Sequence, residues 1–205
     1  MNDEVLDFST PETTSAASVV SPTIEWTALL GCTVLFIVLI VSTARWALRH
    51  PGSPARSLGA LSPAERVLAL VFVISCLLIE ALGATDAYVR TRVLHDSAGA
   101  YFQELSRARL LGISHAHLFG YVFLYGTLGV LISRCAAQRV MKVALVSVLL
   151  WSGVFDVVSW WGMRELSGRF EWLAVLTGMS TALCTALGAW FIARALFEGP
   201  DQKAA

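Results

Sequence analysis

Six ionisable side chains stand inside or at the edges of long apolar stretches of this sequence. They are Glu80, Asp86, His115, His117, Asp156 and Glu171. An ionised side chain at the centre of a membrane costs on the order of 3 kcal/mol on insertion scales, so each of these residues requires a reason. Imidazole nitrogens and carboxylate oxygens bind metal ions and haem iron, and chains of such groups carry protons. The sequence therefore indicates three kinds of chemistry: haem binding, metal binding and proton transfer.

The spacing of the two histidines limits what they can bind together. His115 and His117 are two positions apart, which is about 200° around an α-helix, so they point to nearly opposite faces. They cannot both bind one small metal ion unless the helix unwinds. A carboxylate commonly fixes the second nitrogen of a histidine bound to a metal or haem. The groups expected to orient a ligand or accept protons are Glu80, Asp86, Tyr121 and Asp156.

The string Ser114 to Phe119 resembles the haem-bearing His-x-His helix of haem–copper oxidases. In that family the two imidazoles leave opposite faces of one helix and ligate two different haems. The similarity is confined to this short string, and the copper-binding histidines and the larger number of spans of that family are missing. The resemblance therefore implies only that His115 and His117 are candidate haem ligands.

Two further features of the sequence suit a b-type haem. Arg107 and Arg109 lie at the start of the same apolar stretch, where guanidinium groups would pair with haem propionates. Arginines at that position also bind lipid phosphate. His95, in the preceding loop, is the candidate second axial ligand, opposite either His115 or His117. A five-coordinate haem, or an axial ligand from a partner protein, is equally allowed.

Two alternatives to haem remain open. One histidine with Glu80, Asp156 and Asp86 would give a mixed nitrogen and oxygen shell, which suits an iron, copper or zinc ion. A cofactor-free protein would use the same groups for proton transfer, or for helix packing through His117–Asp156 and His115–Glu80 hydrogen bonds. The four cysteines are scattered singly and are expected to be buried small hydrophobic residues.

Membrane-spanning helices must position all of these side chains. Of the 205 residues, 56% are hydrophobic and 15% are charged, and the mean hydropathy is +0.66. A soluble domain usually has about 25% charged residues. Crossing about 30 Å of hydrocarbon takes roughly 20 helical residues. The predicted spans are residues 26–46, 66–90, 110–134, 141–163 and 171–195.

The distribution of basic residues predicts an orientation. With the N-terminus outside and the C-terminus in the cytoplasm, nine Lys and Arg residues lie on the cytoplasmic side and six lie outside. All six ionisable groups then fall in the outer half of the bundle. We expect residues 1–24 to form a disordered acidic periplasmic tail, residues 25–197 the transmembrane domain and residues 198–205 a cytoplasmic tail. Tyr101 and Phe102 in the outer loop suggest a short helix on the membrane surface.

The balance of charge and the missing motifs exclude other classes. Fifteen basic and fifteen acidic residues give no net charge, which argues against a nucleic-acid-binding protein. The chain has no GxSxG, HExxH or P-loop motif, so no enzyme class is predicted. The prediction is an all-α bundle of five spans in a bacterial inner membrane. Its expected function is that of a haem-binding subunit that passes electrons between the membrane and a periplasmic partner such as a cytochrome.

Overall fold

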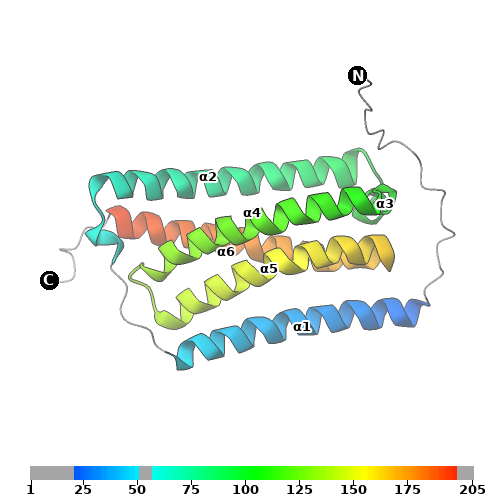
Figure 1. The fold of residues 1–205 in the computed structure, drawn as a ribbon, viewed down its shortest axis with the longest axis horizontal. Helices are drawn as coiled ribbons and strands as arrows, with labels where there is room; N and C mark the ends of the chain where they lie inside the picture. The colour runs from blue at the N-terminus through cyan, green and yellow to red at the C-terminus, as the bar shows by residue number, and fades with distance from the viewer. Residues whose placement is uncertain (1–20, 51–56, 198–205) are drawn as a thin grey trace, which may run out of the picture.

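Five long helices lie side by side in the computed structural model, which describes residues 21–50 and 57–197 (Figure 1). All five are long and apolar enough to cross a membrane, within the described residues. They are α1 (Pro22–Arg49), α2 (Pro63–Tyr88), α4 (Arg107–Ser133), α5 (Arg139–Glu165) and α6 (Glu171–Phe197). The predicted all-α fold with five spans is confirmed. Most of the predicted N-terminal tail and all of the predicted C-terminal tail lie outside the described residues.

The helices extend beyond the apolar stretches because polar residues cap their ends. Ser62 and Glu65 form a capping box at the start of α2, and Pro63 occupies the first turn, where a missing N–H costs nothing. The Ser106 side chain accepts a hydrogen bond from the Arg109 backbone at the start of α4. The helices α2 and α4 therefore begin before the predicted spans, which start at residues 66 and 110.

The fourth of the five spans, α5, is the central helix of the bundle. It packs against α4, α6 and α1, while α2 packs mainly on α6. In Figure 1, α2 and α1 form the two outer edges of the bundle. The side chains of α5 are the most buried of the five spans, which agrees with this central position.

Short helical segments cover one end of the bundle, which we call the α3 end. They are η2 (Val89–Val93, a π-helix), α3 (Ala98–Glu104) and η3 (Gly168–Phe170). The helix α3 occupies the loop where a short helix was predicted. Its apolar face packs on the protein rather than on lipid, because Phe102 is buried and stacks on the Trp160 ring with centroids 5.7 Å apart.

The opposite end of the bundle has an apolar interior. Leu128, Ile132, Leu149 and Ile192 are fully buried there and belong to one hydrophobic cluster. These side chains come from α4, α5 and α6, so the cluster holds the three inner helices together. The six ionisable groups that were predicted to share one end of the bundle lie between this apolar cluster and the α3 end.

Polar contacts at both ends attach α1 to the rest of the bundle. At the α3 end, Glu25 forms an ion pair with Arg169 at 3.0 Å. At the other end, the Arg139 guanidinium donates to the carbonyls of Ala47 and Leu48 at 2.9 and 3.1 Å. Between these points α1 packs on α5 through apolar side chains.

Candidate functional site

Two tyrosine–carboxylate hydrogen bonds join three helices in the α3-end half of the bundle. The Tyr121 hydroxyl on α4 donates to Oδ2 of Asp156 on α5 at 2.8 Å. The Tyr125 hydroxyl, one turn further along α4, donates to Oε1 of Glu80 on α2 at 2.7 Å. The carboxylates thus bond to tyrosines instead of to the histidines that the packing alternative expected.

The two tyrosines link these bonds into one polar cluster. Their rings stack with centroids 5.3 Å apart and planes 14° from parallel. We call these four residues, Glu80, Tyr121, Tyr125 and Asp156, the Tyr–carboxylate cluster.

A glycine on α5 makes room for the Tyr121 ring. A Cβ atom at Gly153 would lie 2.9 Å from Cδ2 of Tyr121 and 3.0 Å from its Cβ and Cγ. Gly153 stands one turn before Asp156, so it sets the distance at which Tyr121 meets the carboxylate. Only the absent side chain of glycine allows this close approach.

His117 lies beside the cluster, between it and the α3 end. Its ring contacts Trp160 and Tyr121 edge-on, with centroids 4.8 and 5.8 Å apart. Its Nδ1 is 2.9 Å from the Ile113 carbonyl oxygen, which leaves Nε2 for another partner. The Trp160 side chain, which contacts His117, is also a neighbour of Asp156.

His115 points away from the cluster, as the spacing predicted. Its side chain is exposed and makes no hydrogen bond or ring contact with the residues that the structure describes. Gly112 and Gly120 flank it along α4, and a Cβ at either would meet nothing within 4 Å. This face of α4 is therefore open to whatever surrounds the chain.

The predicted second axial ligand has other partners. His95 Nδ1 lies 2.6 Å from the Arg90 carbonyl oxygen, and its Nε2 lies 3.2 Å from Oε2 of Glu104. The ring also packs edge-on against Tyr101. These contacts attach the loop after η2 to α3, and they use both nitrogens of His95.

An acidic side chain pairs with one of the two arginines predicted to bind propionates. Arg107 makes a bidentate contact with Glu165, with N···O distances of 3.0 and 2.8 Å. Arg109 is exposed at the start of α4. Asp86 pairs with Arg90 one turn along the same helix at 2.7 Å and so lies apart from the Tyr–carboxylate cluster.

The described residues contain no group of three or more His, Cys, Asp and Glu side chains that could hold a metal ion. His115 and His117 face opposite sides of α4, and the hydrogen bond of His117 goes to the Ile113 carbonyl rather than to a carboxylate. The cysteines do not join the cluster: Cys76, Cys135 and Cys184 are buried singly. Burial raises the pKa of the Cys135 thiol, which lies between two spans, to about 11.

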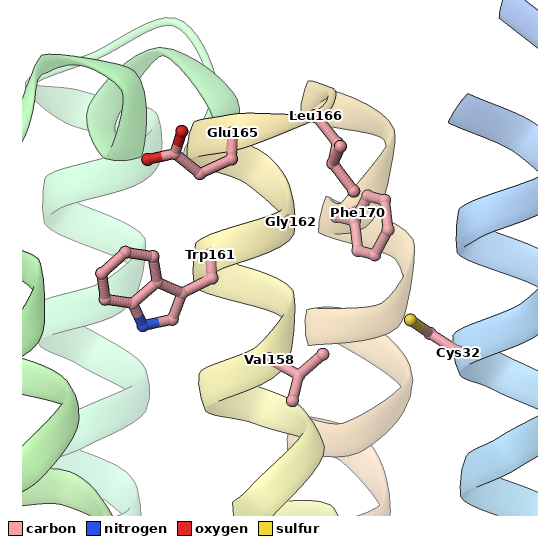
Figure 2. Close-up of a pocket in the computed structure, with 7 residues that line it drawn as sticks. All are labelled: Cys32, Val158, Trp161, Gly162, Glu165, Leu166 and Phe170. Atoms are coloured by element: carbon pink, nitrogen blue, oxygen red, sulfur yellow. The ribbon is translucent and has the colours of Figure 1, made fainter. Parts of the chain in front are cut away.

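A shallow hollow of about 320 Å³ lies between α1 and α5 near the α3 end (Figure 2). Its lining is mostly apolar, and the Cys32 side chain of α1 points toward Phe170 across it. The Trp161 ring turns toward α4, where its Nε1 donates to Ser114 Oγ at 2.9 Å. The hollow contains none of the residues of the Tyr–carboxylate cluster.

A family described as a transmembrane helical domain matches residues 83–203. The chain belongs to this family, Aq_1264_TM. The part of this chain that matches Aq_1264_TM begins just after Glu80. It contains His115, His117, both cluster tyrosines and Asp156. No curated protein and no solved structure matches the chain. The membership establishes a multi-pass membrane protein in a lipid bilayer.

Sequence reasoning missed three parts of this site. Tyr125 was not among the predicted site residues, since its pairing with Glu80 depends on how α2 and α4 are aligned along the membrane normal. Trp160, which contacts His117, was also not among the predicted site residues. Gly153 gave no signal by itself. A glycine one turn from an Asp inside a span, opposite a Tyr of another span, is the pattern that would have identified Gly153.

Proposed function

We propose that this Aq_1264_TM protein exchanges protons between the α3-end surface and the middle of the membrane, through the Tyr–carboxylate cluster. The observation that supports this function is the pair of tyrosine–carboxylate hydrogen bonds, of 2.8 and 2.7 Å, joined by stacked rings. Ionisable groups in series inside a membrane are typical of proton relays. With the orientation predicted from the basic residues, the α3 end faces the periplasm of a bacterial inner membrane.

The depth of each group gives the relay its direction. His117 is ten residues into α4, or about 15 Å from its start at 1.5 Å per residue. Asp156 is nine residues from the end of α5, at a similar depth. Glu80 is thirteen residues before the end of η2, or about 20 Å. The cluster therefore extends from His117 toward the midplane.

A proton would pass along this cluster by a sequence of exchanges between neighbouring groups. His117 takes a proton from the surface and gives it to the Asp156 carboxylate. The next step requires the Tyr121 hydroxyl to turn from Asp156 toward the Tyr125 oxygen. Protonated Asp156 then gives a proton to the Tyr121 oxygen, Tyr121 passes its own proton to Tyr125, and Tyr125 passes its own to Oε1 of Glu80. Each tyrosine ends neutral, so the net change is one proton moved from Asp156 to Glu80.

The apolar cluster beyond Glu80 makes this a dead end. Leu128, Ile132 and Leu149 have no exposed surface, and they fill the bundle between the Tyr–carboxylate cluster and the opposite end. Protons therefore enter and leave from the same side. The proposed activity is exchange with a reaction at the site, rather than conduction across the membrane.

Infrared difference spectroscopy of the purified protein in lipid nanodiscs tests this function. We expect acid-minus-alkaline spectra to contain two carboxyl bands, one lost in Asp156→Asn and the other in Glu80→Gln. Tyr121→Phe removes the bond to Asp156 and should slow proton arrival at Glu80 after a pH jump. If Glu80 titrates equally fast in Tyr121→Phe and in the unchanged protein, the tyrosines do not form the relay.

Haem binding and electron transfer, the function predicted from the sequence, is the second candidate, and His115 supports it. An ionisable side chain without a partner on an open face of a span is costly, and a bound group would remove that cost. A bis-histidine haem does not fit within one copy of the described chain, because both nitrogens of His95 are occupied. The second axial ligand would come from a partner such as a cytochrome.

An absorption spectrum of the protein purified with its native partners tests the haem proposal. Oxidised and dithionite-reduced samples should differ by sharp α and Soret bands, and His115→Ala should abolish them. Metal analysis of the same sample distinguishes haem from an iron, copper or zinc ion. A colourless, metal-free complex would overturn both cofactor proposals.

A further inference from the structure

The half of α2 nearest the α3 end is exposed on all sides of the helix. In the other half, Ala69, Val73 and Cys76 are buried at helical spacing. Glu80 is half-buried, and every residue from 81 to 90 is exposed. We call residues 81–90 the outer segment. Among the described residues, its position depends on the contacts made at its tip, where it continues into η2.

Polar contacts attach the tip of the outer segment to other elements. Arg92, in η2, forms an ion pair with Glu171 in the first turn of α6. His95 follows η2 and joins it to α3. The Nδ1 atom of His95 lies 2.6 Å from the Arg90 carbonyl oxygen, and its Nε2 lies 3.2 Å from Oε2 of Glu104.

Both partners of His95 accept hydrogen bonds. A carbonyl oxygen and a carboxylate have no proton to donate, so both ring nitrogens must carry a proton to bond to them at once. That form is the imidazolium ion, whose charge also attracts the Glu104 carboxylate. A neutral ring keeps one N–H and presents a lone pair at the other nitrogen, which repels the partner oxygen. Because the Glu104 side chain is 70% exposed, its carboxylate can turn to water when the proton is lost.

The titratable and charged side chains around His95 come from every element near it. They are Asp86 on α2, Arg90 and Arg92 in η2, Asp96 in the loop, Tyr101 and Glu104 on α3, and Glu171 on α6. The two arginines are paired with Asp86 and Glu171. The Tyr101 ring packs edge-on against the imidazole, and Glu104 is the acidic side chain in contact with it.

We propose that His95 is a pH-dependent clip between η2 and α3. In acid the doubly protonated ring holds the tip of the outer segment against α3, and loss of one proton at higher pH releases it. Histidine is the side chain whose charge ordinarily changes between about pH 5 and 8. Glu80 is the last residue before the outer segment, so release of the tip changes its distance from Tyr125. Regulation of this kind rests on the proposed proton exchange: the Tyr–carboxylate cluster is complete when the α3-end surface is acidic.

Hydrogen–deuterium exchange tests the His95 clip in the full protein in phosphatidylcholine nanodiscs. Mass spectrometry of peptides that cover residues 84–97 gives exchange rates at about pH 5 and pH 8. Each rate is divided by that of the unfolded chain, which removes the intrinsic effect of pH on exchange. The segment should be about two- to fivefold better protected at the acid pH, the range expected for one solvent-exposed ion pair.

Substitutions distinguish the clip from a general loosening of the loop. His95→Gln and Glu104→Gln should each abolish the difference between the two pH values, because a neutral amide leaves no charged pair to form or break. His50→Gln is the matched control, since Nδ1 of that ring also lies near a carbonyl, 2.9 Å from the Trp46 oxygen, at the opposite end of the bundle. Arg92→Gln removes the other contact at the tip and should raise exchange at both pH values.

The outcomes separate the clip from the proton relay. Equal protection at both pH values in the unchanged protein, or a pH difference that persists in His95→Gln, overturns the clip. His95→Gln should also slow proton arrival at Glu80 after a jump to acid pH, as Tyr121→Phe does. If protection depends on His95 but neither variant slows this step, the clip stands and proton exchange fails. If Tyr121→Phe alone slows it, the relay stands and its regulation by His95 is overturned.

Discussion

Replacing Gly153 by alanine tests the contact on which the Tyr–carboxylate cluster depends. The added Cβ would lie 2.9 to 3.0 Å from three Tyr121 carbons, whereas carbons in contact are usually about 3.5–4.0 Å apart. The ring must therefore move by about 0.5–1 Å. A movement of this size stretches the 2.8 Å bond to Asp156 beyond ordinary hydrogen-bond length.

The free energy of the change is the balance of three contributions. Overpacking in a close-packed interior costs about 2 kcal/mol. Loss of an interhelical hydrogen bond in a membrane adds about 0.6 kcal/mol, while alanine favours the helix over glycine by about 1 kcal/mol. We therefore expect Gly153→Ala to lower the free energy of unfolding by about 1.5 kcal/mol, and to shift the infrared band of the Asp156 carboxyl.

Unfolding by sodium dodecyl sulfate from mixed micelles, followed by tryptophan fluorescence, measures the change in stability. Gly126→Ala on α4 is the control, because a Cβ there meets nothing within 4 Å and only the helix preference changes. Gly126→Ala should leave stability unchanged or slightly raised. If Gly153→Ala is as stable as this control and keeps the Asp156 band, Gly153 does not determine the contact between Tyr121 and Asp156.

Two further substitutions and one labelling experiment have defined outcomes. Gly162→Ala would place a Cβ 2.2 Å from Cδ1 of the buried Phe170, so it should lower the midpoint of the same unfolding transition by more than Gly153→Ala does. Tyr125→Phe removes the partner of Glu80 and should destabilise the protein by about 0.6 kcal/mol, as well as slowing protonation of Glu80 in the pH-jump experiment. Burial raises the pKa of Cys135 to about 11, so maleimide labelling at this position should be slow at pH 7 and faster in unfolded protein. Rapid labelling of folded protein at Cys135 would contradict its burial.

The long-range pattern of hydropathy predicts this fold well. Spans are set by length and composition, which are local properties of the chain, and the opposite directions of His115 and His117 follow from helical rotation alone. The clustering of polar groups at one end was also predictable, because it requires only counting residues from the end of each span. Helix ends were placed less well, since caps such as Ser62 and Ser106 extend the helices into polar sequence.

The contacts between helices could not be predicted from the same information. Whether Glu80 meets His115 or Tyr125 depends on the rotation of α2 about its axis and its height relative to α4, and neither is encoded in a single helix. The loop residue His95 was expected to turn into the bundle, but the π-helix before it directs the ring toward Glu104.

The attachment of α1 has a consequence for how the protein assembles in the membrane. This helix is stable across the bilayer without partners, because it contains no ionisable residue between Glu25 and Arg45. Its contacts at both ends, Arg169 and Arg139, belong to segments that are synthesised much later in the chain. The first span to be inserted is therefore among the last to dock. A chain cut in the loop before α2 should still reassemble. Arg139 at the start of α5 and Arg169 in η3 would then bind α1 again.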